Sequence, residues 1–171
     1  MTLRAGSRLL EWVPRLRRYA RALVRHPQDA DDLVQDTLER TWTKSGHWSG
    51  VRDMRAWLFS LMHNVHVDNL RRPSPDTVDI SDEAMLSVAV NPSHDAALHI
   101  RDLEWALSQL PVEQREVLLL VTLEDMSYTD VARTLHIPVG TVMSRLSRGR
   151  ERLRYLMDEQ PAQRPAIRVV K

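Results

Sequence analysis

The sequence has 171 residues, enough for one medium domain or two small ones, and its 43% hydrophobic and 27% charged residues are typical of a globular protein rather than a disordered one. It contains no cysteine, which excludes disulfides, thiolate zinc sites and cysteine nucleophiles, and no apolar run approaches the roughly 20 residues that span a bilayer. The scarcity of glycine, the many leucines, arginines, alanines and glutamates, and the lack of an apolar secretion signal predict a helical, cytoplasmic protein without membrane insertion.

The net charge of +1 conceals a strong alternation along the chain. Residues 1–26 carry seven arginines and one glutamate, and residues 138–171 carry eight bases and three acids. Residues 73–95 carry five acids and no base. Such alternation indicates several surfaces with different partners, although ordinary solvated faces would also produce it.

Prolines mark the expected domain boundaries. Residues 73–95 begin with Pro-Ser-Pro, end near Asn-Pro-Ser and have no sustained helical period, which predicts an acidic linker. Residues 161–171 contain two prolines and predict a flexible tail. The expected fold is therefore all-α, with two small helical domains at residues 1–72 and 96–160.

Three helices are expected in the first domain. An arginine-rich helix spans about residues 9–25, and Pro14 either kinks it or begins its main part. Between Ala30 and Trp42, apolar residues recur every three or four positions, which predicts an amphipathic helix with its acidic residues on the opposite side. A third helix is expected over about residues 53–71.

The second domain has the helix spacing of a helix-turn-helix. Its expected helices cover about residues 96–108, 112–122, 128–135 and 138–158. The second of them is apolar on every side, which predicts a central, buried helix. Ser127 and Asp130 form an expected capping box, and Pro138 stands where a first helical residue tolerates proline.

The last helix separates an apolar side from a polar one. The residues expected to face the core are Val142, Leu146, Gly149, Leu153 and Leu156. Those expected on the other side are Thr141, Ser144, Arg145, Arg148 and Arg152. Arginine pairs with guanine edges and short hydroxyl side chains hold phosphates, so this side suits a DNA major groove. The alternative is a solvated basic helix in a bundle.

The third helix carries a second candidate nucleic-acid surface. Its residues at helical spacing on one face are Trp57, Ser60, Asn64, Val67 and Arg71. Together they can hydrogen-bond base edges, stack on bases or hold a backbone, although a tryptophan at such a position is more often part of a core.

Two patterns are candidates for metal chemistry: the acidic side of the second helix, and His63 with His66, which are three residues apart but have no facing carboxylate pattern. Asp32 and Asp36 are four residues apart, but no second helix supplies the histidine and glutamate ligands that a metal site needs. We therefore expect no metal, no cofactor and no catalytic residue. A negative face on a basic domain instead favours docking to a basic protein surface.

Short motifs in both domains, in the same order along the chain, resemble the extracytoplasmic-function group of bacterial sigma factors, in the sigma-70 family. In the first domain the resemblance rests on residues 29–38, 55–59, 64 and 68–72. In the second it rests on residues 110–111, 115–120, 127–128, 131–132, 137–142 and 144–146. Two positions depart from the family: Met143 replaces a residue that is commonly basic, and His136 replaces a turn glycine and therefore needs a left-handed backbone.

The resemblance implies a transcription initiation factor without enzymatic activity. Asp32, Gln35 and Glu39 would contact core RNA polymerase at its β′ clamp helices, with the β flap as a further partner. The third helix would receive unstacked bases of the minus-ten element of promoter DNA, and the last helix would read the minus-thirty-five element. The acidic linker would pass through the RNA channel of the polymerase, and an anti-sigma factor would control the protein.

Two other functions fit parts of the pattern. A sigma-like decoy would only sequester an anti-sigma protein and would not need the basic last helix or the Asn64 face. A helix-turn-helix repressor acting alone would leave the acidic helix and the linker without a function.

Overall fold

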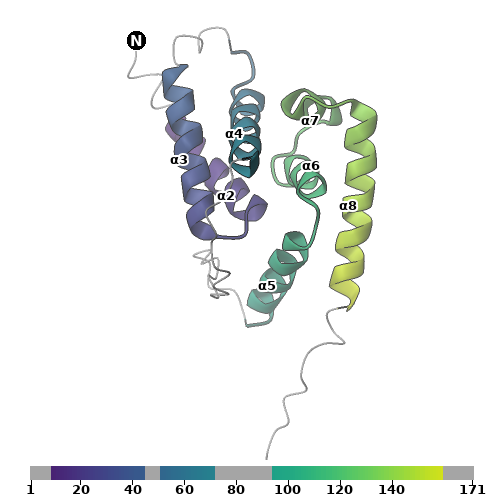
Figure 1. Ribbon diagram of the computed structural model, residues 1–171. Helices are drawn as coiled ribbons and strands as arrows, with labels where there is room; N and C mark the ends of the chain where they lie inside the picture. The colour runs from purple at the N-terminus through teal and green to yellow at the C-terminus, as the bar shows by residue number, and fades with distance from the viewer. Residues whose placement is uncertain (1–8, 45–50, 72–93, 160–171) are drawn as a thin grey trace, which may run out of the picture.

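The computed structural model describes residues 9–44, 51–71 and 94–159, and all regular secondary structure within these ranges is helical (Figure 1). The helices are α2 (Val13–Leu23), α3 (Pro27–Thr43), α4 (Met54–Arg71), α5 (His94–Ser108), α6 (Val112–Thr122), α7 (Tyr128–Leu135) and α8 (Val139–Glu159). The prediction of an all-α fold is confirmed. The predicted tail and most of the predicted linker lie outside the described residues.

Helices α2 to α4 form the N-terminal unit. Pro14 lies in the first turn of α2, so it begins the helix rather than kinking it. The apolar stripe of α3 is buried as expected at Ala30, Leu33 and Val34. Trp42, which was expected to continue this stripe, is instead 55% exposed, although the neighbouring Thr41 is fully buried. At about 100° per residue Trp42 lies about 120° around the helix from Ala30, outside the buried stripe.

Helices α5 to α8 form the C-terminal unit. Helix α6 is buried over residues 115–120, as its apolar sequence predicts. The N-cap half of the expected capping box is present, since the Ser127 hydroxyl accepts a hydrogen bond from the Asp130 N–H at 3.1 Å. The same hydroxyl donates to the Asp130 carboxylate at 2.6 Å. His136 ends α7 in the expected left-handed conformation, with φ at 55°.

Helix α8 lies closely against α6 in this unit. Val142, Leu146 and Leu156 are buried, and Leu153 is half-buried. A Cβ atom at Gly149 would lie 3.4 Å from the Gln114 carbonyl oxygen, in ordinary van der Waals contact, so the space between α6 and α8 admits a methyl group there. The back of α8 is therefore fixed in the core, and its other sides are available to partners.

The two units pack against each other. Helix α4 contacts α7, and α2 contacts α6 (Figure 1). A single cluster of buried apolar residues runs through both units, from Leu16 and Leu58 on one side to Val117 and Val131 on the other. In this arrangement the described helices share one core, so the free chain buries the inner faces of both units against each other.

Candidate protein-docking and nucleic-acid surfaces

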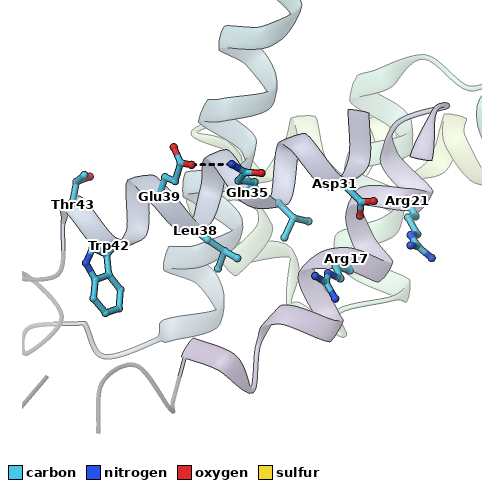
Figure 2. A pocket seen from close by; sticks show the side chains of 9 residues that line it. Arg17, Arg21, Asp31, Gln35, Leu38, Glu39, Trp42 and Thr43 are labelled. Carbon is cyan, nitrogen blue, oxygen red and sulfur yellow. Dashed lines mark hydrogen bonds between the residues drawn. The ribbon is translucent and has the colours of Figure 1, made fainter. Parts of the chain in front are cut away.

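A groove of about 940 Å³ lies between α2 and α3 (Figure 2). Its lining residues are Arg17, Arg21, Asp31, Val34, Gln35, Leu38, Glu39, Trp42 and Thr43. Two of the three predicted docking residues belong to it: Gln35 and Glu39 are exposed, and the Gln35 amide donates a hydrogen bond to the Glu39 carboxylate at 3.1 Å. The third, Asp32, is exposed on α3 but does not line the groove.

Trp42 lines the same groove and was not among the docking residues expected from the sequence. Its indole projects from the same side of α3 as Leu38, toward the groove (Figure 2). Val34 and Leu38 form the apolar part of the groove, here called its floor. Charged side chains of both helices line the groove beside it: Arg17 and Arg21 of α2, and Asp31 and Glu39 of α3. An exposed tryptophan beside an apolar floor with charges of both signs is suited to bind an amphipathic protein helix.

The predicted minus-ten face of α4 is partly at the surface. Asn64 and Arg71 are exposed, whereas Ser60 and Val67 are half-buried. Trp57 is half-buried and packs against the core cluster, in keeping with the alternative reading of this residue. The amide and the guanidinium are therefore the groups on this face that solvent reaches most freely.

One edge of this face lies against the C-terminal unit. The Ser60 hydroxyl is 3.4 Å from His136 Nε2, at the turn between α7 and α8. One turn further along α4, His63 Nδ1 is 2.7 Å from the buried Glu116 carboxylate. A strand of nucleic acid that contacts Ser60 would therefore compete with α7.

The polar side of α8 agrees in part with the prediction. Ser144, Arg148 and Arg152 are exposed, whereas Thr141 and Arg145 are half-buried. Thr141 is also engaged locally, because its carbonyl accepts a hydrogen bond from the Ser144 hydroxyl at 3.1 Å. The exposed members lie between residues 144 and 152, in the first two thirds of the helix.

Sequence reasoning passed over the neighbouring sector of α8. Met143, Ser147 and Arg150 are exposed there and, together with Tyr128 of α7, line a groove of about 470 Å³. Met143 was noted from the sequence only as a departure from the family pattern, and Ser147 and Arg150 were not chosen although they carry the same polar groups as the chosen residues. The angle was available from the sequence, since each residue advances the helix by about 100°.

Buried charges hold the two units together. The carboxylate of Glu124 is fully buried and lies 2.8 Å from Arg15 and 3.3 Å from Arg18, both on α2. Arg55 of α4 donates a hydrogen bond to the Glu124 carbonyl at 3.1 Å. Because an unpaired buried carboxylate is costly, these arginines are needed wherever Glu124 stays buried.

Arg115 makes a second bridge between the units. Its guanidinium donates to the Leu23 carbonyl at 2.6 Å and to the Ser108 and Leu110 carbonyls at 2.8 and 2.9 Å. Burial lowers the pKa of Arg115 from its ordinary value, and the nearby Arg25 charge lowers it further. It remains a donor that ties the end of α2 to the α5–α6 turn.

Two further buried groups lie close to this interface. Burial raises the pKa of Tyr19 well above its ordinary value, and the charges of Glu116 and Glu124 raise it further. Burial lowers the pKa of His66, whose Nε2 atom has no hydrogen-bond partner. Both side chains therefore remain neutral near pH 7, and protonation of His66 is opposed by the fold.

Neither a metal centre nor a membrane span is found in the described part of the chain. Within residues 9–44, 51–71 and 94–159, no three His, Asp or Glu side chains gather as metal ligands would. No helix in the same ranges is long and apolar enough to cross a bilayer.

Comparisons with known proteins match both units. Residues 9–63 match the model of the Sigma2 domain of PhyR, and residues 100–153 match the model of region 4 of sigma-70. The ECF RNA polymerase sigma factor EcfG of Rhodopseudomonas palustris is 33% identical over 149 residues, which cover 87% of this chain and 82% of the relative. The ECF RNA polymerase sigma factor SigM of Mycobacterium tuberculosis is 32% identical over 150 residues, covering 83% and 71%.

Two solved structures with a similar fold are complexes with a partner protein. The sigma factor RpoE of Bartonella quintana, in complex with the anti-sigma factor NepR, has a TM-score of 0.74 and 33% identity, covering 90% of this chain and 96% of that one. CnrH, in complex with the cytosolic domain of CnrY, has a TM-score of 0.65 and 27% identity, covering 90% and 86%.

Proposed function

Because this chain belongs to the extracytoplasmic-function (ECF) group of RNA polymerase sigma factors, we propose that it binds core RNA polymerase, directs it to specific promoters and helps to melt their minus-ten element. The chain itself performs no chemistry in this role. It supplies binding surfaces, and the polymerase makes the RNA.

The observation that carries the proposal is that three exposed surfaces of different chemistry occur on one small protein. The α2–α3 groove combines Trp42 with charges of both signs, which suits a protein helix. Helix α4 presents Asn64 and Arg71, and α8 presents Arg148 and Arg152. A lone DNA-binding repressor needs only the last of these surfaces.

The polymerase would dock at the α2–α3 groove. Gln35 and Glu39 would make polar contacts at its edge, and the Trp42 indole would enter an apolar pocket on the partner. Asp32 lies on the same helix outside the groove and would add electrostatic steering toward a basic surface.

Promoter DNA would contact α4 and α8. Asn64 would accept and donate hydrogen bonds to a base that has left the stack, and Arg71 would hold a nearby phosphate. On α8, Arg148 would pair with a guanine edge in the major groove, with Ser144, Arg145 and Arg152 holding the backbone. Thr141 lies at the start of the same helix, where backbone N–H groups favour a phosphate.

An anti-sigma factor would control the chain by binding it in the packed arrangement. Of the two similar proteins of known structure, RpoE is bound by the anti-sigma factor NepR and CnrH is bound by the cytosolic domain of CnrY. Such a partner would keep Ser60 against His136 and so keep the minus-ten face partly covered.

Run-off transcription with purified core polymerase tests this function. The chain is added to core polymerase and a library of genomic fragments, and the 5′ ends of the transcripts are sequenced. We expect initiation at a small set of promoters with a shared motif. A chain that binds an anti-sigma protein but never yields a transcript would instead be a sigma-like decoy, and tight binding to closed duplex without polymerase would indicate a repressor.

A further inference from the structure

Helix α8 carries an exposed apolar side chain in the middle of its polar surface. Met143 is 55% exposed, five residues into the helix, and is followed by Ser144 and, one turn later, by Ser147. Tyr128, Ser147 and Arg150 share the small groove that it borders. Single exposed apolar side chains are common on protein surfaces, so what Met143 can contact depends on its position on the helix.

The position of Met143 on the helix is favourable for contact with DNA. The outward direction of α8 is taken as the one opposite its buried stripe. At about 100° per residue, Met143 lies about 75° from this outward direction, whereas Arg145 lies about 125° from it. The half-buried state of Arg145 agrees with this difference. Met143 therefore faces outward more directly than an arginine that was itself expected to contact DNA.

The chemistry of the major groove limits what Met143 can recognise. The edges of the base pairs present hydrogen-bond donors and acceptors, and the single apolar group among them is the C5-methyl of thymine. A thioether is a weak acceptor and cannot donate a hydrogen bond, but its flexible, polarizable chain packs well against a methyl group. The neighbouring side chains of Ser144 and Ser147 are shorter than that of Met143, so they would not block its contact with the methyl group.

We propose that Met143 is a specificity-determining residue that recognises the C5-methyl group of one thymine in the upstream promoter element. The inference rests on the proposed function, because it requires α8 to lie in the major groove. It assigns to one position of that element a preference that no arginine of this helix would produce.

Replacement of thymine by uracil isolates the contact, because uracil lacks only the methyl group. Holoenzyme assembled from the full chain and core polymerase is assayed on a promoter found by run-off transcription, with each upstream thymine replaced in turn. Complete removal of one methyl group from water corresponds to about a fourfold change in affinity. We expect a two- to fourfold loss at a single position and no loss at the others.

Three variants distinguish a methyl contact from a general effect of the side chain. Met143→Leu keeps an apolar group and should keep the preference for thymine, whereas Met143→Gln has a similar length and should abolish it. Methionine, leucine and glutamine are all good helix formers, so α8 remains intact in both Met143 variants. Leu103→Ala, which removes an apolar side chain of α5 that is 40% exposed, should leave the preference unchanged.

The outcomes separate this inference from the function on which it rests. Equal activity on thymine and uracil at every upstream position, with normal transcription, would overturn the role of Met143 and leave the sigma factor function standing. A uniform loss for Met143→Gln on all sequences would also overturn it, because a backbone contact has no base preference. A wild-type chain that supports no transcription would refute both.

Discussion

Removal of the ion pairs of the buried Glu124 carboxylate should cost more stability when the arginines are replaced than when the glutamate is. Its side chain is fully buried, whereas its two partners, Arg15 and Arg18, are 38% and 55% exposed. Replacement of both arginines by glutamine leaves a buried charge without a counter-ion. Glu124→Gln instead leaves two arginines that water already reaches, so the same ion pairs are removed at a lower cost.

The magnitudes follow from this difference in exposure. Breaking a buried ion pair so that a charge is left uncompensated costs about 3–5 kcal/mol, and the half-exposed arginines place the double variant at the lower end, about 3 kcal/mol. Glu124→Gln should cost about 1 kcal/mol, since it loses charge-assisted hydrogen bonds but strands no buried charge. A free-energy difference of about 1.4 kcal/mol corresponds to a factor of ten in an equilibrium constant. The equilibrium constants for loss of the packed arrangement should therefore differ between the two variants by more than tenfold.

The stranded carboxylate can regain water without unfolding, by separation of the two units. The double variant should therefore populate an open arrangement before it denatures. Since the chain has no cysteine, two introduced cysteines can be labelled alone, for example at the exposed positions Gln28 on α3 and Glu113 on α6. The distance distribution between the labels reports opening, and circular dichroism reports the helices.

A matched control is available on the same helix. Arg17→Gln removes an exposed arginine of α2 that lines the groove and lies outside the Glu124 ion pairs, and it should change neither the distances nor the melting temperature appreciably. If Glu124→Gln opens the chain as much as the double arginine variant does, burial of the carboxylate does not govern the interface and the reasoning is wrong.

Four further predictions address the other sites. Trp42→Ala should weaken binding to core polymerase at least tenfold, because a central aromatic side chain often contributes about 2 kcal/mol or more, and unchanged binding in a titration would show that the groove is not the docking site. Asn64→Ala should slow open-complex formation, measured by permanganate reactivity, while core binding stays intact; loss of core binding would mean that the wrong surface was assigned. Gly149→Ala should raise the free energy of unfolding by about 0.5–1 kcal/mol, because its Cβ fits at 3.4 Å from Gln114 and alanine favours helices, whereas Gly149→Leu should lower it by overpacking. Burial lowers the pKa of His66 from 6.5, so the unfolded chain binds the proton more readily, and the free energy of unfolding should fall as the pH falls through 6.5. His66→Phe should remove part of this pH dependence, and identical pH profiles of unfolding for the two proteins would contradict the prediction.

The sequence predicted local structure well because the signals for it are local. The α3 stripe, the Ser127 cap and the left-handed His136 each depend on residues within a few positions of one another. Trp42 was wrongly expected to be buried, because at about 100° per residue it lies about 120° around α3 from Ala30, outside the stripe that Thr41 continues to the end of the helix.

The contacts between the units could not be predicted in the same way. Arg15 and Glu124 are 109 positions apart, and His63 and Glu116 are 53 apart. Arginines and glutamates are frequent in this sequence, so charge alone does not identify the pairs. Only the relative placement of α2, α4, α6 and α7 selects them, and that placement depends on the shape of the whole buried surface.

The packed arrangement couples the two candidate DNA surfaces through His136. This residue ends α7 in a left-handed conformation, immediately before the turn that orients α8, and its ring contacts Ser60 on the edge of the α4 face. Contact of nucleic acid with Ser60 requires α4 to leave α7, and the same separation frees the turn beside α8. A ligand that binds the α4 face only in the open arrangement therefore raises the population of the open arrangement. If a second ligand also selects the open arrangement by binding α8, each ligand strengthens the binding of the other by the same factor, as thermodynamic linkage requires.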